Sequence, residues 1–336
     1  MADIMDKSKN SKLKCGISKM ENAPFFSLVD YRNNYFTSSE SEKIMGFYEG
    51  FENSEQLVKW MSDRPGGVSR IFEVEGNKEI VVVIPTGDFK GKYAKRCSEE
   101  IFTGLHLVFV ESGGRGDFYF NYAHNCNIGV KKALEYNPKW IVVSNDDMVK
   151  IDDVDVLRNE LSNLNPEKLK TVFTGQSSYH SYSTTVGIKR RIIGELGYLL
   201  NYSLKGKLRD FLDIKRILKK YNVAWDQGPR NLLLSKIFLK VVHTFVIGSC
   251  FSILSGKWCE KVGGNVYNEC YINGVEDWEQ SIMLTMNSAD YSYIRYKIGD
   301  LVGQTMPADY IRSLRNVCNV VYFNARIEHF LGKNDI

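Results

Sequence analysis

The sequence lacks the cysteine and histidine patterns of disulfide-rich and zinc-binding proteins. Its seven cysteines are an odd number scattered over 336 residues, and no two of them form a C-x-x-C pair. The five histidines are equally dispersed. Such a set of cysteines argues against a disulfide framework and against a zinc site, and it indicates a reducing compartment.

Long apolar segments are also missing from the chain. The longest nearly apolar stretch, residues 241–254, has about 14 residues, whereas a transmembrane helix needs roughly 20. The segment 1–15 is polar and rich in lysine, which predicts a disordered terminus and does not resemble a signal peptide. We therefore expect a cytoplasmic protein.

Neither sign of charge prevails in the chain as a whole, because 44 Lys and Arg face 40 Asp and Glu, a net charge of +4. The distribution is uneven. Residues 187–221 hold ten basic and three acidic side chains, a local charge of +7 that leaves −3 for the rest of the chain. A net acidic remainder argues against nucleic-acid binding. The helical spacing of apolar residues in this basic segment predicts helices that either dock on an anionic membrane or form a solvated face.

Strand-like and helix-like segments alternate from Glu79 onward. Short aliphatic runs are typical of strands buried on both faces of a sheet. The predicted strands are 80–84, 105–110, 140–144 and 171–174, and the helices between them are 92–102, 122–136 and 152–164. This alternation predicts an α/β protein with a mainly parallel, Rossmann-like central sheet flanked by helices.

The segments outside this alternation are assigned from their local patterns. Upstream, residues 25–29 predict a strand and 54–61 a short helix that begins with a serine cap. Downstream, the pattern predicts one or two strands in 241–254, helices in 276–287 and 309–331, and a strand in 291–296.

Polar residues follow three of the predicted strands where each strand ends. These ends are Pro85-Thr86-Gly87-Asp88, Glu111-Ser112-Gly113-Gly114 and Asn145-Asp146-Asp147. The carboxyl ends of parallel strands meet at one edge of a sheet, so the three ends can form one pocket. There, Glu111 is placed to accept hydrogen bonds from a ribose or a base. Three plain turns are the alternative, but the acid at every end favours the pocket.

Asp146 and Asp147 are two adjacent carboxylates at the rim of an apolar core. They repel each other unless a cation or hydrogen-bond donors offset their charge. Adjacent residues of a strand point in opposite directions, so we expect Asp147 to bind a cation and Asp146 to hydrogen-bond the substrate or to reach the ion through water. Oxygen ligands suit Mg²⁺ or Mn²⁺. The structural alternative is a turn that leads into a helix capped by aspartate.

A second acidic group, Glu276, Asp277 and Glu279, opens the predicted helix 276–287. Acids in a first helical turn complement the helix dipole, which is a purely structural role. In the functional interpretation, one of these acids is a general base that faces an acceptor hydroxyl.

The order of these motifs resembles the family 2 inverting glycosyltransferases with the A-type fold. The resemblance covers residues 79–330, and its motifs are individually short but fairly specific in their order and spacing. It rests on the strand ends above, Asn127-Ile128-Gly129, the stretch 248–254 with Val262-Gly263-Gly264, and Glu276-Asp277. Two departures stand out: the triplet is Asn-Asp-Asp rather than Asp-x-Asp, and the region just before Gly303-Gln304-Thr305 lacks the histidine that some members of the family carry.

The resemblance implies metal-dependent, inverting transfer of a hexosyl-type sugar from a nucleotide-diphosphate donor to a hydroxyl of a glycan or lipid-linked acceptor. It makes Asp277 the catalytic base and Asp147 the metal ligand. The implied donor-binding residues are Pro85, Thr86, Glu111, Asn127, Asn145 and Asp146, and the implied acceptor-side residues are Gly248, Glu276 and Trp278.

The resemblance also divides the chain into four parts. They are an N-terminal extension (1–78), a nucleotide-sugar-binding half (79–175), a basic helical insertion (176–240) and an acceptor-binding half with C-terminal helices (241–336). A lipid-linked acceptor would bring the protein to the inner membrane face as a peripheral protein, with 187–221 as the contact.

Two other functions remain open at this point. A sugar-phosphate nucleotidyltransferase would use a similar sheet and metal, but it needs a glycine-rich basic loop after the first strand, and residues 87–92 are a faint version of one. A non-catalytic protein that binds glycans or partners on a transferase scaffold would not need to retain Asp146, Asp147 and Asp277.

Overall fold

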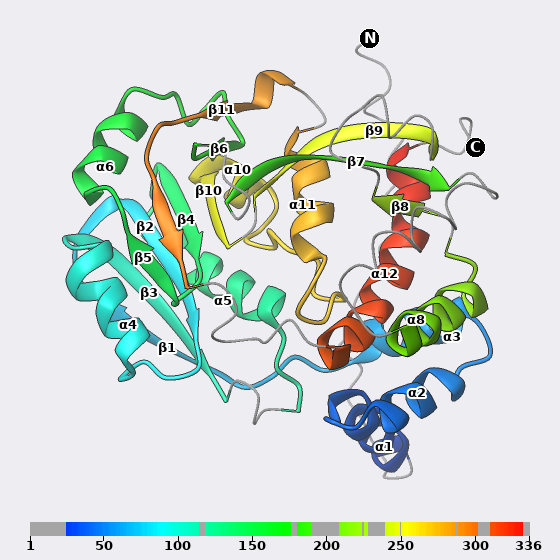
Figure 1. The fold of residues 1–336 in the computed structure, drawn as a ribbon. Helices are drawn as coiled ribbons and strands as arrows, with labels where there is room; N and C mark the ends of the chain where they lie inside the picture. Colours follow the sequence, from blue (N-terminus) through cyan, green and yellow to red (C-terminus); the bar gives the residue numbers. More distant parts are fainter. Residues whose placement is uncertain are drawn as a thin grey trace.

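The computed structural model describes residues 25–113, 118–175, 180–189, 208–223, 225–227, 239–248, 250–285, 288–301 and 310–331. It is an α/β protein with a mixed seven-stranded sheet flanked by helices, and a smaller antiparallel sheet lies beside a helical region (Figure 1). The disorder expected for the segment 1–15 lies outside the described residues.

The large sheet carries the strands predicted from the sequence and adds others. In spatial order its strands are β1 (Ser69–Val74), β3 (Leu105–Ser112), β2 (Asn77–Thr86), β4 (Trp140–Ser144), β10 (Phe251–Ser255), β6 (Thr171–Phe173) and β11 (Tyr291–Tyr293). The central strands β3, β2 and β4 are parallel, and so are β6 and β11. By contrast, β1 and β10 run antiparallel to their neighbours, so the sheet as a whole is mixed and its centre is parallel.

Helices cover both faces of the large sheet, which explains why its central strands are apolar throughout. Along β2, Val81 and Val83 pack on one face against α5 (Tyr122–Leu134) and α10 (Gly256–Lys261). On the other face, Val82 packs with side chains of α4 (Lys92–Arg96), the π-helical turn Cys97–Ile101 and α6 (Val154–Ser162).

Helix α5 lies unusually close to the sheet because of Gly129. A Cβ atom at this position would come 2.3 Å from Cγ1 of Val83 and 2.9 Å from Cγ2 of Val110. Only glycine therefore lets the helix approach β2 and β3 at the observed height.

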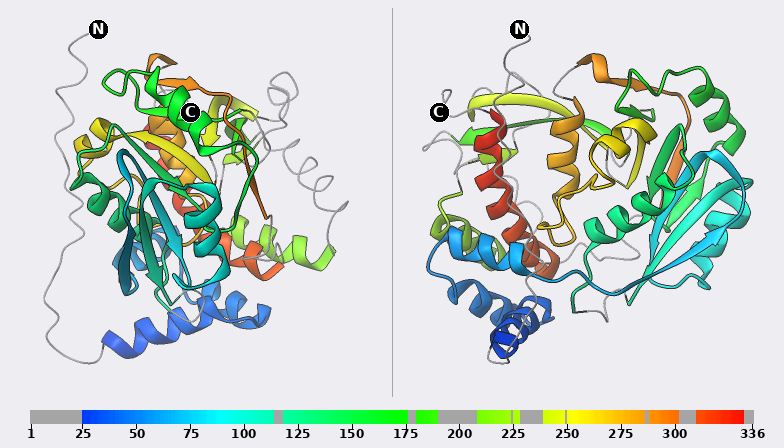
Figure 2. Two further views of the ribbon diagram at one scale, coloured as in Figure 1. Left: turned by 90° about the vertical axis from the view of Figure 1, so that its left-hand side faces the viewer. Right: turned by 180° about the vertical axis from the view of Figure 1, so that it is seen from behind.

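A second core is built from helices far apart in sequence. Its helices are α1 (Phe25–Thr37), α2 (Ser41–Glu49), α3 (Ser54–Asp63), α8 (Leu208–Lys220), α11 (Glu276–Thr285) and α12 (Tyr310–Leu331). The first three lie at one end of the molecule against α12 (Figure 2). Buried Tyr48 joins three of the helices: its hydroxyl donates to the Leu314 carbonyl at 2.6 Å and accepts the Cys318 N–H at 3.0 Å, and the Tyr221 hydroxyl donates to the Tyr48 carbonyl at 2.6 Å.

The insertion 176–240 is not wholly helical, which corrects the prediction. Within the described residues, β7 (Ser181–Lys189) and β8 (Trp225–Gln227) form an antiparallel sheet with β9 (Leu239–Gly248), and α8 is its helical part. The sequence of β7 is rich in Ser, Thr and other residues that suit a paired strand. Residues 190–207, which carry four of the ten basic side chains of the segment 187–221, lie outside the described residues.

Two predictions for the N-terminal part differ from the structure. Residues 25–29 begin helix α1, which continues to Thr37, and do not form a strand. The short helix predicted at 54–61 is confirmed as α3, but its cap is Asn53 rather than a serine, because the Asn53 side chain accepts the Gln56 N–H. β1, which belongs to the segment 1–78, forms an edge of the large sheet.

Candidate active site

The three polar strand ends meet at one edge of the sheet, as their parallel pairing requires. Thr86 at the end of β2 is opposite Glu111 on β3, and Val83 is opposite Val143 on β4. Pro85 is buried inside β2. The Thr86 hydroxyl donates to Oδ2 of Asp146 at 2.7 Å, so the first and third strand ends are in direct contact.

The pair Asp146 and Asp147 lies in a largely buried setting. Asp147 is only 3% exposed, and its carbonyl accepts the N–H of Leu301 at 3.0 Å. The Cys97 thiol donates to the Asp146 carbonyl at 3.3 Å. Burial raises the pKa of Asp146 to about 6, and the neighbouring charge of Asp147 adds to the shift, while the Thr86 hydroxyl opposes it.

A divalent cation fits this pair chemically. Two carboxylates that raise each other's cost of ionisation are stabilised by a nearby positive charge, and Mg²⁺ commonly binds through one or two carboxylates together with substrate phosphates. Within the described part of the chain, no group of three or more His, Cys, Asp or Glu side chains has the arrangement of a metal site.

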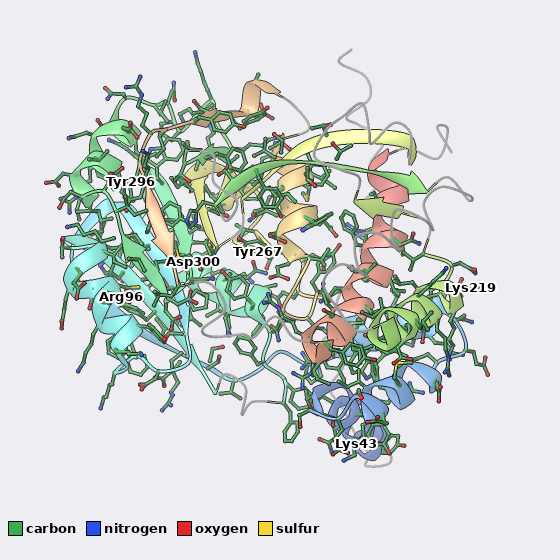
Figure 3. All side chains as sticks on the ribbon, viewed as in Figure 1. Lys43, Arg96, Lys219, Tyr267, Tyr296 and Asp300 are labelled. Carbon is green, nitrogen blue, oxygen red and sulfur yellow. The ribbon has the colours of Figure 1, made fainter. Side chains whose placement is uncertain are left out.

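Two further groups reach this edge that the sequence did not reveal. A two-stranded sheet pairs β12 (Ile298–Asp300) with β5 (Met148–Lys150), which sets Asp300 opposite Met148. The Nδ1 atom of His180 lies 3.4 Å from the Cys250 thiol. Burial raises the pKa of Cys250, and the charges of Asp300 and Asp147 contribute, so these groups share one region. Figure 3 labels Asp300 on β12.

One basic residue, Arg96, lies close enough to Asp146 to affect its pKa. Arg96 ends α4, next to Cys97, and its charge lowers the pKa of Asp146 against the larger effect of burial. It is labelled in Figure 3. Two nitrogens of its guanidinium, Nε and Nη2, are buried without a hydrogen-bond partner among the described residues.

The second acidic group opens α11 from a strained turn. Asn273 and Val275 both have positive φ, 56° and 70°. Glu276 is buried, and Asp277 is partly buried. Burial, followed by the charge of Glu276, raises the pKa of Asp277 to about 8. Burial also raises the pKa of Glu276.

Tyr122 joins the two acidic groups. Its hydroxyl donates to Oδ1 of Asn145 at 2.9 Å. Burial raises the pKa of Tyr122, and the charge of Glu276 adds to this rise. Tyr267, labelled in Figure 3, has its pKa raised mainly by burial and also by Asp277 and Glu276. Since the Tyr122 N–H also donates to Oδ1 of Asn273 at 2.9 Å, Tyr122 connects the third strand end to the turn before α11.

Glu111 and Asn127, two of the predicted donor-binding residues, are engaged with neighbouring groups of the protein. Both carboxylate oxygens of Glu111 have partners, because Oε1 pairs with Arg70 and Oε2 accepts the Phe89 N–H, each at 2.8 Å. Buried Asn127 uses its amide on the backbone of Tyr267, donating at 2.9 Å and accepting at 3.0 Å.

Gly248 and Trp278 lie deeper, on the side of the second core. The Gly248 N–H donates to the Ser281 hydroxyl at 3.4 Å. The Trp278 ring packs against Phe245 and Phe323. Gly114, Ser249 and the triplet Gly303-Gln304-Thr305 lie outside the described residues.

No family model matches this chain. A search of curated proteins finds no significant match either. Among the helices that the structure describes, none combines the length and the apolar character that crossing a membrane requires. The functional assignment therefore depends on the chemistry of the site.

Proposed function

We propose that this protein is a metal-dependent, inverting glycosyltransferase of the A-type fold. It would move a sugar from a nucleotide-diphosphate donor to a hydroxyl of a glycan or lipid-linked acceptor. The observations that support this proposal are two hydrogen bonds of Tyr122, from its hydroxyl to Asn145 and from its N–H to Asn273, because together they connect the third strand end to the turn that leads into Glu276 and Asp277.

The strand-end carboxylates account for donor binding. Asp147 would hold Mg²⁺ or Mn²⁺, with Asp146 and Thr86 beside it. Once bound, such an ion neutralises negative charge on a leaving diphosphate. These acids lie near the carboxyl ends of parallel strands, which is where open α/β sheets bind nucleotides.

Asp277 accounts for activation of the acceptor. A base with a pKa of about 8 holds a proton more strongly than an ordinary carboxylate does, so it can draw one from a hydroxyl as that oxygen attacks. Attack on the anomeric carbon from the side opposite the leaving group inverts the configuration. The proton passes to Asp277, and the nucleoside diphosphate leaves with the electron pair of the broken C–O bond.

The test is transfer or hydrolysis of a panel of nucleotide sugars in the presence of Mn²⁺. Asp277→Asn should lower turnover about 10²- to 10⁴-fold, the usual contribution of a general base, while donor affinity measured by calorimetry is retained. Efficient turnover by this variant would remove Asp277 from the mechanism.

Asp147→Ala tests the metal half of the proposal. We expect this variant to lose the metal-dependent part of donor binding, because the carboxylate that holds the ion is gone. Calorimetric titrations of the donor with Mn²⁺ and with EDTA compare the two states. An affinity that equals that of the wild type in Mn²⁺ would contradict the assignment.

The same assays distinguish the alternatives. A sugar-phosphate nucleotidyltransferase would release diphosphate from a nucleoside triphosphate and a sugar phosphate. A non-catalytic protein would bind a glycan or donor and turn over none of them. Between β2 and α4, Glu111 already occupies the Phe89 N–H, which leaves this turn less suited to a triphosphate.

The basic segment supports membrane docking only in part. On α8, Lys220 donates to the Tyr48 carbonyl at 2.8 Å, and Arg216 pairs with Glu49, so both serve the second core. Lys219 is exposed. Co-sedimentation with anionic vesicles tests whether the segment adds a peripheral contact at the inner membrane face.

A further inference from the structure

The side chain of Asn145 is held in one orientation at the site. Its Oδ1 accepts the Tyr122 hydroxyl at 2.9 Å, and its main-chain N–H donates to the Cys250 carbonyl at 3.0 Å. The side chain is partly exposed, in contrast to the buried Asp147 that follows two residues later. The amide therefore combines a fixed direction with access to a ligand.

Tyr122 is itself fixed from two sides. Its N–H donates to Oδ1 of Asn273 at 2.9 Å. The preceding residue, Asn121, caps α5 and donates to the carbonyls of Glu269 and Tyr271 at 2.7 and 3.1 Å. Tyr122, whose hydroxyl reaches Asn145, thus begins α5 and is held by hydrogen bonds to the loop that leads into α11.

The polarity of the amide follows from this contact. A primary amide offers one acceptor oxygen and one nitrogen with two donors. Because Tyr122 engages the oxygen, the NH₂ group of Asn145 faces away from it. Asp146 and Asp147 accept hydrogen bonds when ionised, so Asn145 is the donor of the triplet.

We infer that Tyr122 is a positioning residue that turns the Asn145 NH₂ group toward an anionic oxygen of the donor's diphosphate. This inference rests on the proposed function. An amide suits this place better than a third acid, because a third carboxylate would add negative charge beside Asp146, Asp147 and the approaching phosphates.

Three variants separate the orientation of the Asn145 amide by Tyr122 from the hydrogen bond that the Asn145 NH₂ group donates. Asn145→Asp keeps an oxygen that accepts the Tyr122 hydroxyl and removes the NH₂ group. Asn145→Ala removes both, and Tyr122→Phe removes only the hydroxyl. As a matched control, Tyr136→Phe removes a tyrosine hydroxyl that pairs with Glu73 beyond the other end of α5.

The measurement is calorimetric binding of UDP, GDP and ADP at saturating Mn²⁺, with melting curves for every variant. We expect Asn145→Asp and Asn145→Ala to weaken diphosphate binding about 10- to 100-fold, as the loss of a hydrogen bond to a charged group does. Tyr122→Phe should weaken it less, and its effect should vanish in the Asn145→Ala background. Tyr136→Phe should bind as the wild type does.

The outcomes that overturn the inference are distinct. If both Asn145 variants bind the nucleoside diphosphates as tightly as the wild type does, Asn145 does not contact the diphosphate. Affinity retained in Asn145→Asp but lost in Asn145→Ala makes Asn145 an acceptor for a sugar or ribose hydroxyl instead. If the wild type binds none of the nucleoside diphosphates, the proposed function falls, and this inference falls with it. If Tyr122→Phe melts far below the wild type, the comparison of the two Asn145 variants still decides.

Discussion

Asp277 shows how a single carboxylate takes its chemistry from its surroundings. The residue follows a buried acid at the start of α11, and it loses solvent in a region that it shares with buried Tyr267. Both influences favour the protonated, neutral form. When such a side chain ionises, it therefore lowers the stability of the folded state.

The raised pKa of Asp277 predicts a pH dependence of folding. The folded-state pKa of about 8 exceeds the unfolded value of 3.8, so the stabilising contribution is complete below about 4 and is lost as the pH rises through 8. Asp277→Asn does not titrate. The melting temperature of the variant, relative to the wild type, should therefore increase between pH 5 and pH 8.5.

The exposed Asp63 provides the control, because Asp63→Asn changes the same kind of side chain in open solvent, where it pairs with Lys59. Its melting-temperature difference from the wild type should stay nearly constant over this pH range. A constant difference for Asp277→Asn as well would show that Asp277 ionises normally in the folded protein.

Local sequence patterns predicted the acids of the site, but not all of their neighbours. Asp146, Asp147 and Asp277 stand out because each lies at the end or start of a recognisable element. His180 and Asp300 gave no such signal. Asp300 reaches the site through the pairing of β5 with β12, two strands that are distant in the sequence, and His180 precedes a strand that the sequence did not reveal.

At the scale of elements, the positions of strands were predicted most accurately where a strand is buried on both faces of the sheet. β2 and β4 are continuous aliphatic runs, and their positions agree with the predicted ranges. β7 was missed because its stability comes from pairing with β9, much later in the chain, and not from an apolar pattern of its own. The strand predicted at 25–29 is instead the start of α1, whose Tyr31 and Tyr35 rings, one helical turn apart, lie 4.2 Å from each other between centroids.

The turn before α11 contains a position, Val275, at which we expect glycine to give a more stable protein than alanine, the reverse of the order within a helix. Val275 has a φ of 70°, which costs a residue with a Cβ atom about 1–2 kcal/mol. Val275→Ala and Val275→Gly both lose the valine contacts, but only glycine relieves this cost. We expect Val275→Gly to be more stable than Val275→Ala by about 1 kcal/mol in urea unfolding.

The same two substitutions at Val156 give the comparison. Val156 is 37% exposed within α6, where glycine is less favourable than alanine by about 0.8–1 kcal/mol. The two sites should therefore rank alanine and glycine in opposite orders. An identical ranking at both sites would contradict the positive φ of Val275.

At the scale of the whole molecule, two cores lie next to each other, and the candidate site draws residues from both. The sheet core contains β2, β3 and β4, and the helical core joins α1, α2 and α3 to α8, α11 and α12. Nothing local in the sequence predicts the second core, because Tyr48 and Leu314 are 266 residues apart when they hydrogen-bond. α11 belongs to this second core and carries Asp277, so the site depends on how the two cores fit together.

Tyr48→Phe tests the helical core. The substitution keeps the ring and removes a buried hydroxyl that donates to Leu314 and accepts from Cys318. We expect it to lower the free energy of unfolding by about 1–2 kcal/mol, since a buried carbonyl loses its donor. Chemical denaturation measures the change. Tyr31→Phe, at a side chain that is 55% exposed, should leave the stability nearly unchanged, and equal effects of the two would rule out the buried network.

The missing side chain at Gly129 has a consequence beyond packing. It sets the height of α5 above the sheet, and the first turn of the same helix carries Tyr122 to Asn145. Even one added methyl group at position 129 would push α5 away from the sheet and separate the Tyr122 hydroxyl from the Asn145 amide. Gly129 is an interior position without charge or polarity, yet the residue found there determines whether the Tyr122–Asn145 contact can form. Substitutions at position 129 should therefore affect a hydrogen bond nearly two helical turns away.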